Sequence, residues 1–353
     1  MTAPRIALVA GQWGQNIGNA FFNLGGRHAL EQVFGPGSVG FFQDQPNYRT
    51  LHNKHRGNPG THAELIADLD IDALVLQGPV LNAWFRKSWE QAFAILRDRG
   101  VRIILHSAAF FKFRPDEFAA VRDFVSEFPP ALISTRDSRS CAVLRDWLPG
   151  VPIYDGIDAG FFLPDCLQPF ELGQNSDYIV CNFDRYPEPD ILPAVPGDPA
   201  AVTIAGRGYL LRVPQRLNRM AKASKIQAYL GDLTDRRRLP ASLDGLRILR
   251  PEHRFFPHMT HKIYRHPGAI VSDEPWSYAT VYAHSGMTLS DRVHACVATL
   301  AYGNPAMLFT PSPRAALFER LGLAQIRDRP VRLCPDRLSA AKAAQIDWMR
   351  AHV

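Results

Sequence analysis

The sequence has no long apolar run and few cysteines. No stretch of about eighteen or more apolar residues occurs, and the first residues do not join a charged segment to an apolar signal core. We therefore expect neither a transmembrane span nor secretion. The five cysteines are an odd number, lie far apart and form no C-x-x-C pair, which argues against a disulfide framework and a zinc site.

Patterns typical of several binding functions are also missing. Neither the G-x-G-x-x-G fingerprint nor the Walker pattern occurs. The histidines between His253 and His266 are irregularly spaced and have no carboxylate beside them, so they do not indicate a metal site. Apart from Arg236–Arg238, which is most simply a solvated face, the arginines are dispersed and match no nucleic-acid-binding motif. These absences disfavour a metalloenzyme and a nucleic-acid-binding protein.

The composition is that of a globular protein with a basic balance. A chain of 353 residues with 46% hydrophobic and 21% charged residues is long enough for about two domains. The formal charge of +6 and the pI near 9.1 favour an acidic ligand or an anionic surface as the partner.

The stretch Met287–Phe309 predicts a strand, a polar turn, a short helix and a second buried strand. Arg292 and His294 fall at the start of that helix, where unpaired N–H groups and the helix dipole favour an anion. Ser290 or Asp291 is the expected N-cap, and Gly303 is expected to close the helix in a left-handed conformation. The alternative is a solvated surface pair, which is common for Arg and His at a helix start.

Two earlier turns also follow strands. The strand Arg5–Ala10 leads into a loop rich in Gly and amide side chains that ends in Asn16-Ile17-Gly18-Asn19, before a helix over 20–34. Taken alone, this loop is an ordinary strand-to-helix turn. The strand at 131–135 delivers Arg136 to a turn in which Asp137 or Ser138 can cap the next helix. Arg136 either pairs with a nearby carboxylate or binds the carboxylate or phosphate of a ligand, which its planar donors suit.

Other segments give simpler expectations. Residues 41–62 are polar and predict a loop able to cover the site, and His106, at a strand end, is interpreted as a structural histidine. In the second half the pattern predicts, among other elements, strands Ser224–Tyr229 and Leu246–Leu249 and helices Ala315–Leu321 and Ser339–Ala351.

The three turns together resemble the polysaccharide pyruvyl transferase family. The family carries Asn-x-Gly-Asp where this chain has Asn16–Asn19, an Arg-Asp followed by Ser where it has Arg136-Asp137-Ser138, and a serine before Arg-Leu-His where it has Ser290-Asp291-Arg292-Val293-His294. The resemblance implies an α/β protein with two Rossmann-like doubly wound domains facing a cleft, a glycosyltransferase-B-like fold. It places the first domain at 1–165, a linker at 166–176, the second domain at 177–335 and a C-terminal helix at 336–353.

The resemblance also implies a chemistry. Pyruvate from phosphoenolpyruvate is transferred onto a sugar diol of a polysaccharide or its precursor, forming a ketal, without a cofactor or a metal. The acceptor is a sugar or oligosaccharide, free or lipid-linked, so the implied location is the cytoplasm or the inner face of the membrane, with peripheral membrane contact allowed. Residues implied in catalysis are His294 as proton donor, Arg136 and Arg292; those implied in substrate binding are Arg314, Asn16, Gly18, Asn19, Ser290 and Arg185.

Two positions depart from the family pattern. Asn19 replaces the family's acid, and Gln77-Gly78-Pro79 stands where the family often has a run of glycines. Two other functions therefore stay open: an inverting glycosyltransferase that uses a nucleotide sugar, and a non-catalytic homologue that binds an anionic ligand. The pyruvyl transferase hypothesis makes a geometric prediction, namely that Arg136 and His294 face each other across the cleft between the domains.

Overall fold

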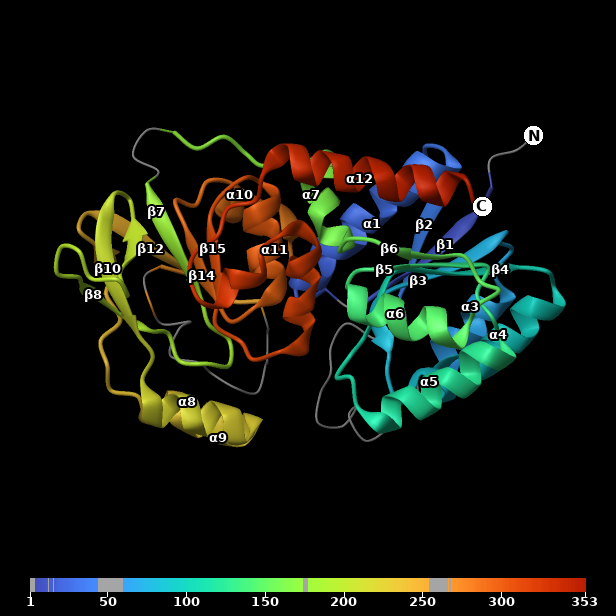
Figure 1. Ribbon diagram of the computed structural model, residues 1–353, viewed down its shortest axis with the longest axis horizontal. Helices are drawn as coiled ribbons and strands as arrows, with labels where there is room; N and C mark the ends of the chain where they lie inside the picture. Colours follow the sequence, from blue (N-terminus) through green and yellow to red (C-terminus); the bar gives the residue numbers. More distant parts are fainter. Residues whose placement is uncertain are drawn as a thin grey trace.

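Two sheets of mainly parallel strands organise the chain into two domains that lie side by side (Figure 1). The computed structural model describes residues 4–11, 13–14, 16–43, 60–173, 177–253, 266 and 268–353. The parallel pairing confirms the predicted α/β class, since parallel strands need helical crossovers that cover both faces of the sheet.

The first sheet has six parallel strands in the order β2-β1-β3-β4-β5-β6. Its central strands are buried on both faces, which explains their continuous apolar sequences. The strands are β1 (Ile6–Ala10), β2 (Val39–Gln43), β3 (Ala73–Leu81), β4 (Arg102–Phe110), β5 (Leu132–Thr135) and β6 (Ile153–Asp155). The helices of this domain are α1 (Gly18–Phe34), α3 (Gly60–Asp68), α4 (Phe85–Asp98), α5 (Pro115–Glu127) and α6 (Ser138–Trp147).

Helix α4 shows how the sequence builds this core. Phe85, Trp89, Phe93 and Leu96 recur every three or four residues, so they line one face of the helix, and all four are buried. The rings of Phe85 and Phe93 both contact Phe124 of α5, with ring centroids 5.1 Å apart in each case. These aromatic contacts fix the two helices against the sheet.

The second sheet has the strand order β11-β12-β7-β14-β15, with β13 paired to β12. All its pairs are parallel except β11 with β12. The strands are β7 (Tyr178–Asn182), β11 (Ser242–Leu243), β12 (Leu246–Pro251), β13 (Ala269–Ile270), β14 (Thr288–Ser290) and β15 (Ala306–Leu308), and the helices are α10 (Pro275–Ala283) and α11 (Val293–Ala301). None of the described helices has the length and apolar character needed to cross a membrane.

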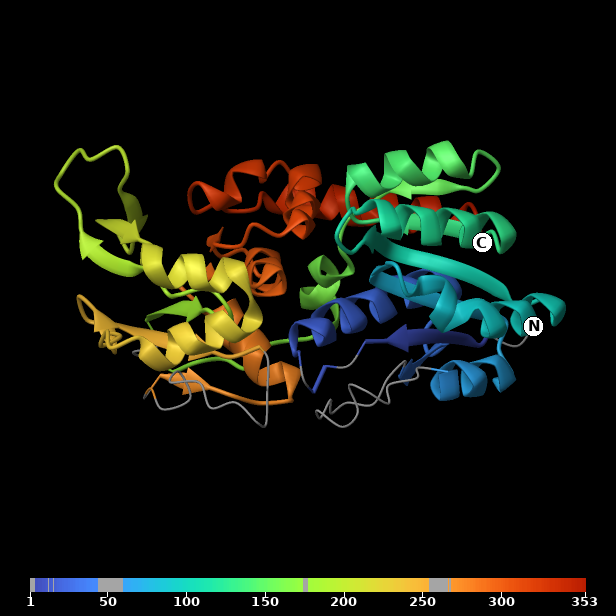
Figure 2. The ribbon, with the colours of Figure 1, turned by 90° about the horizontal axis from the view of Figure 1, so that it is seen from below.

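An insertion after β7 carries a small antiparallel sheet and a helical hairpin. The sheet joins β8 (Asp190–Pro193), β10 (Arg207–Arg212) and β9 (Val202–Ile204), and the hairpin joins α8 (Gln215–Ala223) to α9 (Lys225–Thr234). Figure 2 shows this insertion at the end of the molecule opposite to both termini.

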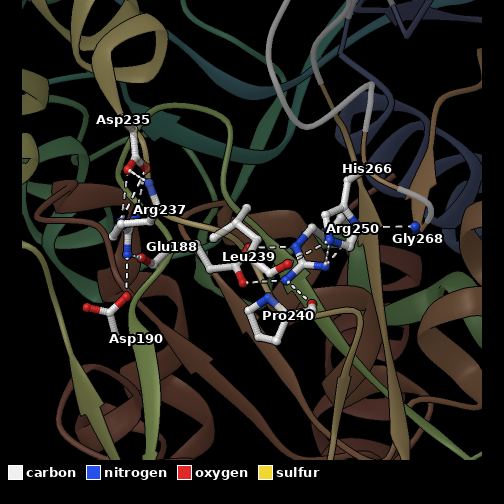
Figure 3. Close-up of polar contacts among 9 residues, drawn as sticks. All are labelled: Glu188, Asp190, Asp235, Arg237, Leu239, Pro240, Arg250, His266 and Gly268. Atoms are coloured by element: carbon white, nitrogen blue, oxygen red, sulfur yellow. Dashed lines mark hydrogen bonds and ion pairs between the residues drawn. The ribbon is translucent and has the colours of Figure 1, made fainter.

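One buried ion pair fastens the insertion to the second sheet, and a partly exposed pair holds the end of its hairpin (Figure 3). Arg250 of β12 is fully buried and donates to both carboxylate oxygens of Glu188 at 2.8 and 2.7 Å. Its remaining donors contact the His266 ring and the Pro240 carbonyl. Arg237, just after α9, bonds to Asp190 of β8 at 2.7 Å and to Asp235. The end of the hairpin is therefore held to both sheets.

Four short helices and a long terminal helix join the domains. The connection from β6 runs through η1 (Ala159–Phe162) and α7 (Leu163–Cys166), and β15 is followed by η3 (Pro313–Leu321) and η4 (Ala324–Arg327). Helix α12 (Pro335–Arg350) then crosses back, as Figure 1 shows along the top edge. Leu338 packs into the core of the second domain and Met349 into that of the first.

Some sequence expectations for these elements were wrong. Ser224–Tyr229 is not a strand but the start of α9, and Ser224 caps that helix by accepting from the Gln227 N–H at 3.0 Å. The segment predicted as a helix over 315–321 is the 3-10 helix η3, and the terminal helix begins earlier than predicted, at Pro335. Most of the loop predicted over 41–62 lies outside the described residues, and 41–43 belong to β2.

Candidate functional site

The turn after β14 lies at the carboxyl edge of the second sheet. Ser290 pairs in register with Asn182 of β7, and its hydroxyl donates to the Asn182 side-chain oxygen at 3.0 Å. The same hydroxyl accepts from the Arg292 N–H at 2.8 Å. The N-cap of α11 is Arg292, without a side-chain cap, so the prediction of Ser290 or Asp291 as the cap was wrong. Gly303 follows the helix with φ 86°, which confirms the predicted left-handed end.

Asp291 instead organises the loop after β7. Its carboxylate accepts the backbone N–H groups of Asp184, Arg185 and Tyr186 at 2.8 to 3.2 Å. Burial and the neighbouring Asp184 charge raise the pKa of Asp291 to about 6, against the lowering effect of Arg292. Burial, followed by the Asp184 charge, also raises the pKa of Glu252 well above its ordinary value. Asp184, Glu252 and Asp291 thus form a cluster of buried carboxyl groups next to Arg292.

Arg292 connects this cluster to the first domain. Its Nε lies 3.1 Å from the Asp184 carboxylate, and its Nη2 donates to the Asn16 side-chain oxygen at 2.7 Å. The Asn16 amide in turn donates to the Asn19 side chain at 2.9 Å. The structure therefore brings together Arg292, Asn16 and Asn19, which the sequence places in two separate motifs.

His294 lies where α11 meets the first turn of α1. A Cβ added to Gly18 would lie 3.1 Å from the His294 Cβ, so the close approach of the two helices depends on glycine there. On another side, the His294 ring packs on Phe22, with ring centroids 5.1 Å apart. His294 is consequently only 8% exposed.

Arg136 and His294 converge on one carboxylate of the first domain. Arg136 follows β5, and its Nη1 donates to the Asp158 Oδ2 at 2.8 Å. The Nε2 of His294 lies 3.5 Å from the same oxygen, at the outer limit of a hydrogen bond. The other carboxylate oxygen of Asp158 accepts from the Gly160 N–H at 2.9 Å and caps η1. Asp137 caps α6 by accepting from the Ser140 N–H, as predicted.

The electrostatics of these groups are coupled. Burial would raise the pKa of Asp158, but the charges of His294 and Arg136 and the bond from Gly160 outweigh it and lower that pKa. Burial lowers the pKa of His294, since the attraction of Asp158 is offset by the charges of Arg136 and Arg314. In the described structure, the Arg136 Nη2 has no hydrogen-bond partner. Asp158 is thus ionised, His294 is neutral near pH 7, and one guanidinium donor is unused.

Comparison with known proteins identifies the family of this chain. The polysaccharide pyruvyl transferase profile matches residues 16–313, which include all three motifs and Asp158. The chain belongs to the polysaccharide pyruvyl transferase family. No curated protein matches the sequence.

Solved structures confirm the fold class of this family member. It is similar to the S. aureus protein MnaA, solved with UDP, with a TM-score of 0.51, 11% identity, and coverage of 99% of this chain and 90% of that one. It is also similar to UDP-GlcNAc 2-epimerase from Neisseria meningitidis bound to UDP-GlcNAc, with a TM-score of 0.50, 10% identity, and coverage of 98% and 93%. These neighbours share the glycosyltransferase-B-like fold of two Rossmann-like domains.

The predicted open cleft is not what the structure of this family member shows. Arg136 is 1% exposed and His294 8%, so they meet in a closed interface instead of facing each other across a gap. The reason is that Asp158, Gly18 and Phe22 of the first domain fill the space around the His294 ring. A substrate reaching these groups requires the two domains to separate.

Two further arginines predicted at the site occupy different surroundings. Arg314 lies over the Phe111 ring of the first domain, 5.7 Å from its centroid, and is close enough to lower the pKa of His294. Arg185 donates through Nε and Nη2 to the Ala221 carbonyl at 3.1 and 2.9 Å, at the carboxyl end of α8. The predicted substrate contact of Arg185 therefore stays a prediction.

Sequence reasoning missed the role of Asp158, whereas the nearby His106 is buried, as expected for the structural histidine that was predicted. Asp158 was given no role from the sequence, and the only local signal was an acidic residue shortly after β6, which ends at Asp155. His106 lies near Asp158, and its Nδ1 shares a hydrogen bond of 3.0 Å with the Ser134 hydroxyl. Its Nε2 has no partner among the described residues. Burial lowers the pKa of His106 to about 4, despite the Asp158 charge.

Proposed function

We propose that this family member transfers pyruvate from phosphoenolpyruvate onto a sugar diol and forms a ketal. The observation that carries the proposal is the meeting of Arg136 and His294 at the Asp158 carboxylate, with Arg292 on the adjoining loop. A small ligand with one phosphate and one carboxylate needs several fixed cations and a proton donor. Arg136, Arg292 and Arg314 provide the charge, and His294 provides the proton.

The lowered pKa of His294 fits a donor that is charged only when ligand is bound. Without ligand, burial keeps the imidazole neutral. Phosphoenolpyruvate brings negative charge against the ring, which raises the pKa of His294 and draws a proton onto it. Asp158 stabilises the imidazolium and orients Nε2, so its role is positioning. The domains close over the bound ligand, and the site excludes water.

The reaction follows from one proton and two hydroxyl groups. His294 gives its proton to the methylene carbon, and the adjacent carbon becomes electrophilic. One sugar hydroxyl forms a C–O bond to that carbon and returns its proton to the now neutral His294. The bond to phosphate then breaks, and phosphate leaves with the electron pair. The neighbouring hydroxyl forms the second C–O bond, and its proton passes to phosphate. The products are the ketal, with its new methyl group, and inorganic phosphate.

This chemistry needs no cofactor. The proposed acceptor is a sugar or oligosaccharide of polysaccharide synthesis, either free or linked to a lipid. The predicted contacts of Asn16, Gly18, Asn19 and Ser290 with substrate belong to the same proposal. In the structure Asn16 and Ser290 contact Arg292, Asn19 contacts Asn16, and Gly18 packs against His294, which supports this part of the proposal.

The test is His294→Asn, assayed by phosphate release from phosphoenolpyruvate with a panel of oligosaccharide diols and by the ketal methyl signal in NMR. Loss of a general acid predicts a fall in kcat of about a hundredfold to ten-thousandfold. His352→Asn, at an exposed position near the chain end, is the matched control and keeps full activity. Wild-type turnover by His294→Asn excludes the proposed role.

A nucleotide-sugar glycosyltransferase is the second candidate, because the structural neighbours were solved with UDP and UDP-GlcNAc. In that case the arginines hold a diphosphate. Thermal shift separates the two, since a ligand at about a hundred times its Kd stabilises the folded state by about 2.7 kcal/mol. We expect a shift with phosphoenolpyruvate that Arg136→Met removes. A shift with nucleotide sugars alone favours the glycosyltransferase, and phosphoenolpyruvate binding without turnover of any acceptor favours a non-catalytic homologue.

A further inference from the structure

The helical hairpin presents apolar side chains to solvent. Ile226, Leu230 and Leu233 of α9 are 73%, 46% and 51% exposed. Their spacing of four and three residues places them on one face of the helix. A surface helix normally turns such a stripe toward the core, so an exposed stripe marks a surface that contacts something else. We call these three residues the apolar stripe.

Positive charge flanks the apolar stripe. Between Asp198 and Asp232 the sequence has six Lys or Arg residues and no Asp or Glu, in a chain whose formal net charge is +6. Three of these cations, Arg216, Arg219 and Lys222, are exposed and recur every three residues along α8, so they lie on one side of that helix. We call these three residues the basic face.

The hairpin is a fixed part of the fold. Gly231 of α9 packs against Leu217 and Met220 of α8, where an added Cβ would lie 3.6 Å from each. Arg185 holds the carboxyl end of α8 through the Ala221 carbonyl, and Arg237 holds the end of α9 (Figure 3). Exposure of the apolar stripe is therefore a property of the folded domain, and Figure 1 shows the hairpin along its lower edge.

We propose that the hairpin docks on the surface of an anionic lipid bilayer, with the apolar stripe in the interface and the basic face against acidic headgroups. An interfacial helix combines these two features, with apolar burial and electrostatic attraction adding up. A second copy of the chain is a poorer partner, because a two-fold contact brings the two basic faces together. Nucleic acid does not require the apolar stripe. The proposal is independent of the donor substrate.

A physical link runs from the docked surface to the candidate site. Arg185 bonds to the end of α8 through its side chain, while its backbone N–H donates to Asp291, next to Arg292. A bilayer contact that holds α8 thus also holds the loop that carries Arg292. If the proposed function is correct, this arrangement suits an acceptor sugar linked to a lipid.

Vesicle co-sedimentation of the full chain tests the proposal. We expect binding to vesicles of phosphatidylcholine mixed with phosphatidylglycerol, weakened by salt, and little binding to phosphatidylcholine alone. Arg216→Gln/Arg219→Gln should weaken binding by at least about tenfold, given the attraction of each cation near such a surface. Ile226→Ser/Leu230→Ser should weaken it to a similar degree. Circular dichroism and thermal melting check that both variants stay folded.

Matched controls change the same chemistry elsewhere. Val195→Ser removes an apolar side chain that is 74% exposed in the same domain, and Arg122→Gln/Arg329→Gln removes two exposed cations outside the hairpin. Both should bind vesicles as wild type does. The proposal is overturned by absence of binding, by equal binding to neutral vesicles, or by a dimer in sedimentation that Ile226→Ser/Leu230→Ser dissolves. Poly-uridine binding that needs the basic face but not the apolar stripe also overturns it.

Discussion

Among the described residues, two arginine–carboxylate pairs are fully buried, one in each domain, and they differ in how fully their donors are used. Arg250 in the second domain bonds through Nε and Nη2 to both oxygens of Glu188, and its remaining donor contacts His266. Arg136 in the first domain donates once to Asp158, and its Nη2 has no partner among the described residues. The two pairs are alike in burial and charge, but only in the Arg250 pair are all the buried donors of the guanidinium hydrogen-bonded.

We interpret this difference as one between a structural pair and a pair whose arginine binds a ligand. A buried charge is tolerated when its hydrogen bonds are satisfied, which is how Arg250 fastens the insertion to the sheet. An unused buried donor costs free energy, so its presence beside a neutral histidine of the other domain indicates a group reserved for a ligand. The Arg136–Asp158 pair meets His294 of the other domain, whereas the Arg250–Glu188 pair lies within the second domain.

The largest expected effect concerns stability. Arg250→Met leaves the buried Glu188 without its cation, so we expect a loss of about 3 to 5 kcal/mol in the free energy of unfolding. Arg136→Met should lower the free energy of unfolding by only about 1 kcal/mol. Asp158 keeps its hydrogen bond from the Gly160 N–H, and without the Arg136 charge the pKa of His294 rises, so that a protonated His294 can pair with Asp158. Urea denaturation followed by circular dichroism measures both.

Activity should rank the same two variants in the opposite order. Phosphate release from phosphoenolpyruvate should be lost in Arg136→Met and retained by the folded fraction of Arg250→Met. Equal stability losses in the two variants, or full activity in Arg136→Met, would remove the distinction between the two pairs.

A smaller effect should appear in the pH dependence of stability. The folded pKa of His106 is about 4, below the ordinary value of 6.5, so protonation favours the unfolded state. Its contribution is full above about pH 6.5 and is lost as the pH falls toward 4, by about 1.4 kcal/mol per pH unit. His106→Asn keeps a partner for Ser134 and should remove this part of the slope.

The difference between wild type and His106→Asn isolates one group. Burial raises the pKa of Asp291 to about 6, and this carboxyl therefore makes the folded state more stable as the pH falls, opposite in sign to His106. Taking the difference between two unfolding curves at each pH removes that contribution. An unchanged slope in His106→Asn would mean that His106 is not neutral and desolvated as the structure indicates.

The sequence allowed much of this architecture to be predicted, for local reasons. Apolar runs such as Arg5–Ala10 and the alternation of strands with helices indicate a parallel sheet, because strands buried on both faces have nearly continuous apolar sequences. That Arg136 and His294 face each other across a cleft was also predicted, since both follow strand ends in different domains. The structure confirms that they come together, although in a closed interface.

What sequence reasoning missed depends on contacts between distant residues. Asp158 is 22 residues from Arg136, and no local pattern shows that it also meets His294 of the other domain. Helix α9 was mistaken for a strand, because the segment Ser224–Tyr229 contains only Ile226 of the apolar stripe and is too short to show the helical spacing. Domain closure was unpredictable for a similar reason, as it rests on tight packing of particular glycines.

The smallest predicted effect tests that packing. Gly18→Ala adds a methyl group 3.1 Å from the His294 Cβ, so the first turn of α1 or the His294 ring must shift by a few tenths of an ångström. A displaced general acid should lower kcat severalfold. Stability should change by less than about 1 kcal/mol, because the higher helix propensity of alanine offsets the crowding.

Gly231→Ala in α9 is the matched control, since its added methyl group meets only flexible side chains at 3.6 Å. It should gain up to about 1 kcal/mol from helix propensity and leave turnover unchanged. Steady-state kinetics and urea denaturation on both variants give the comparison. If Gly18→Ala matches Gly231→Ala in both measurements, His294 does not depend on the close contact with α1. The closed interface would then have no part in placing the acid.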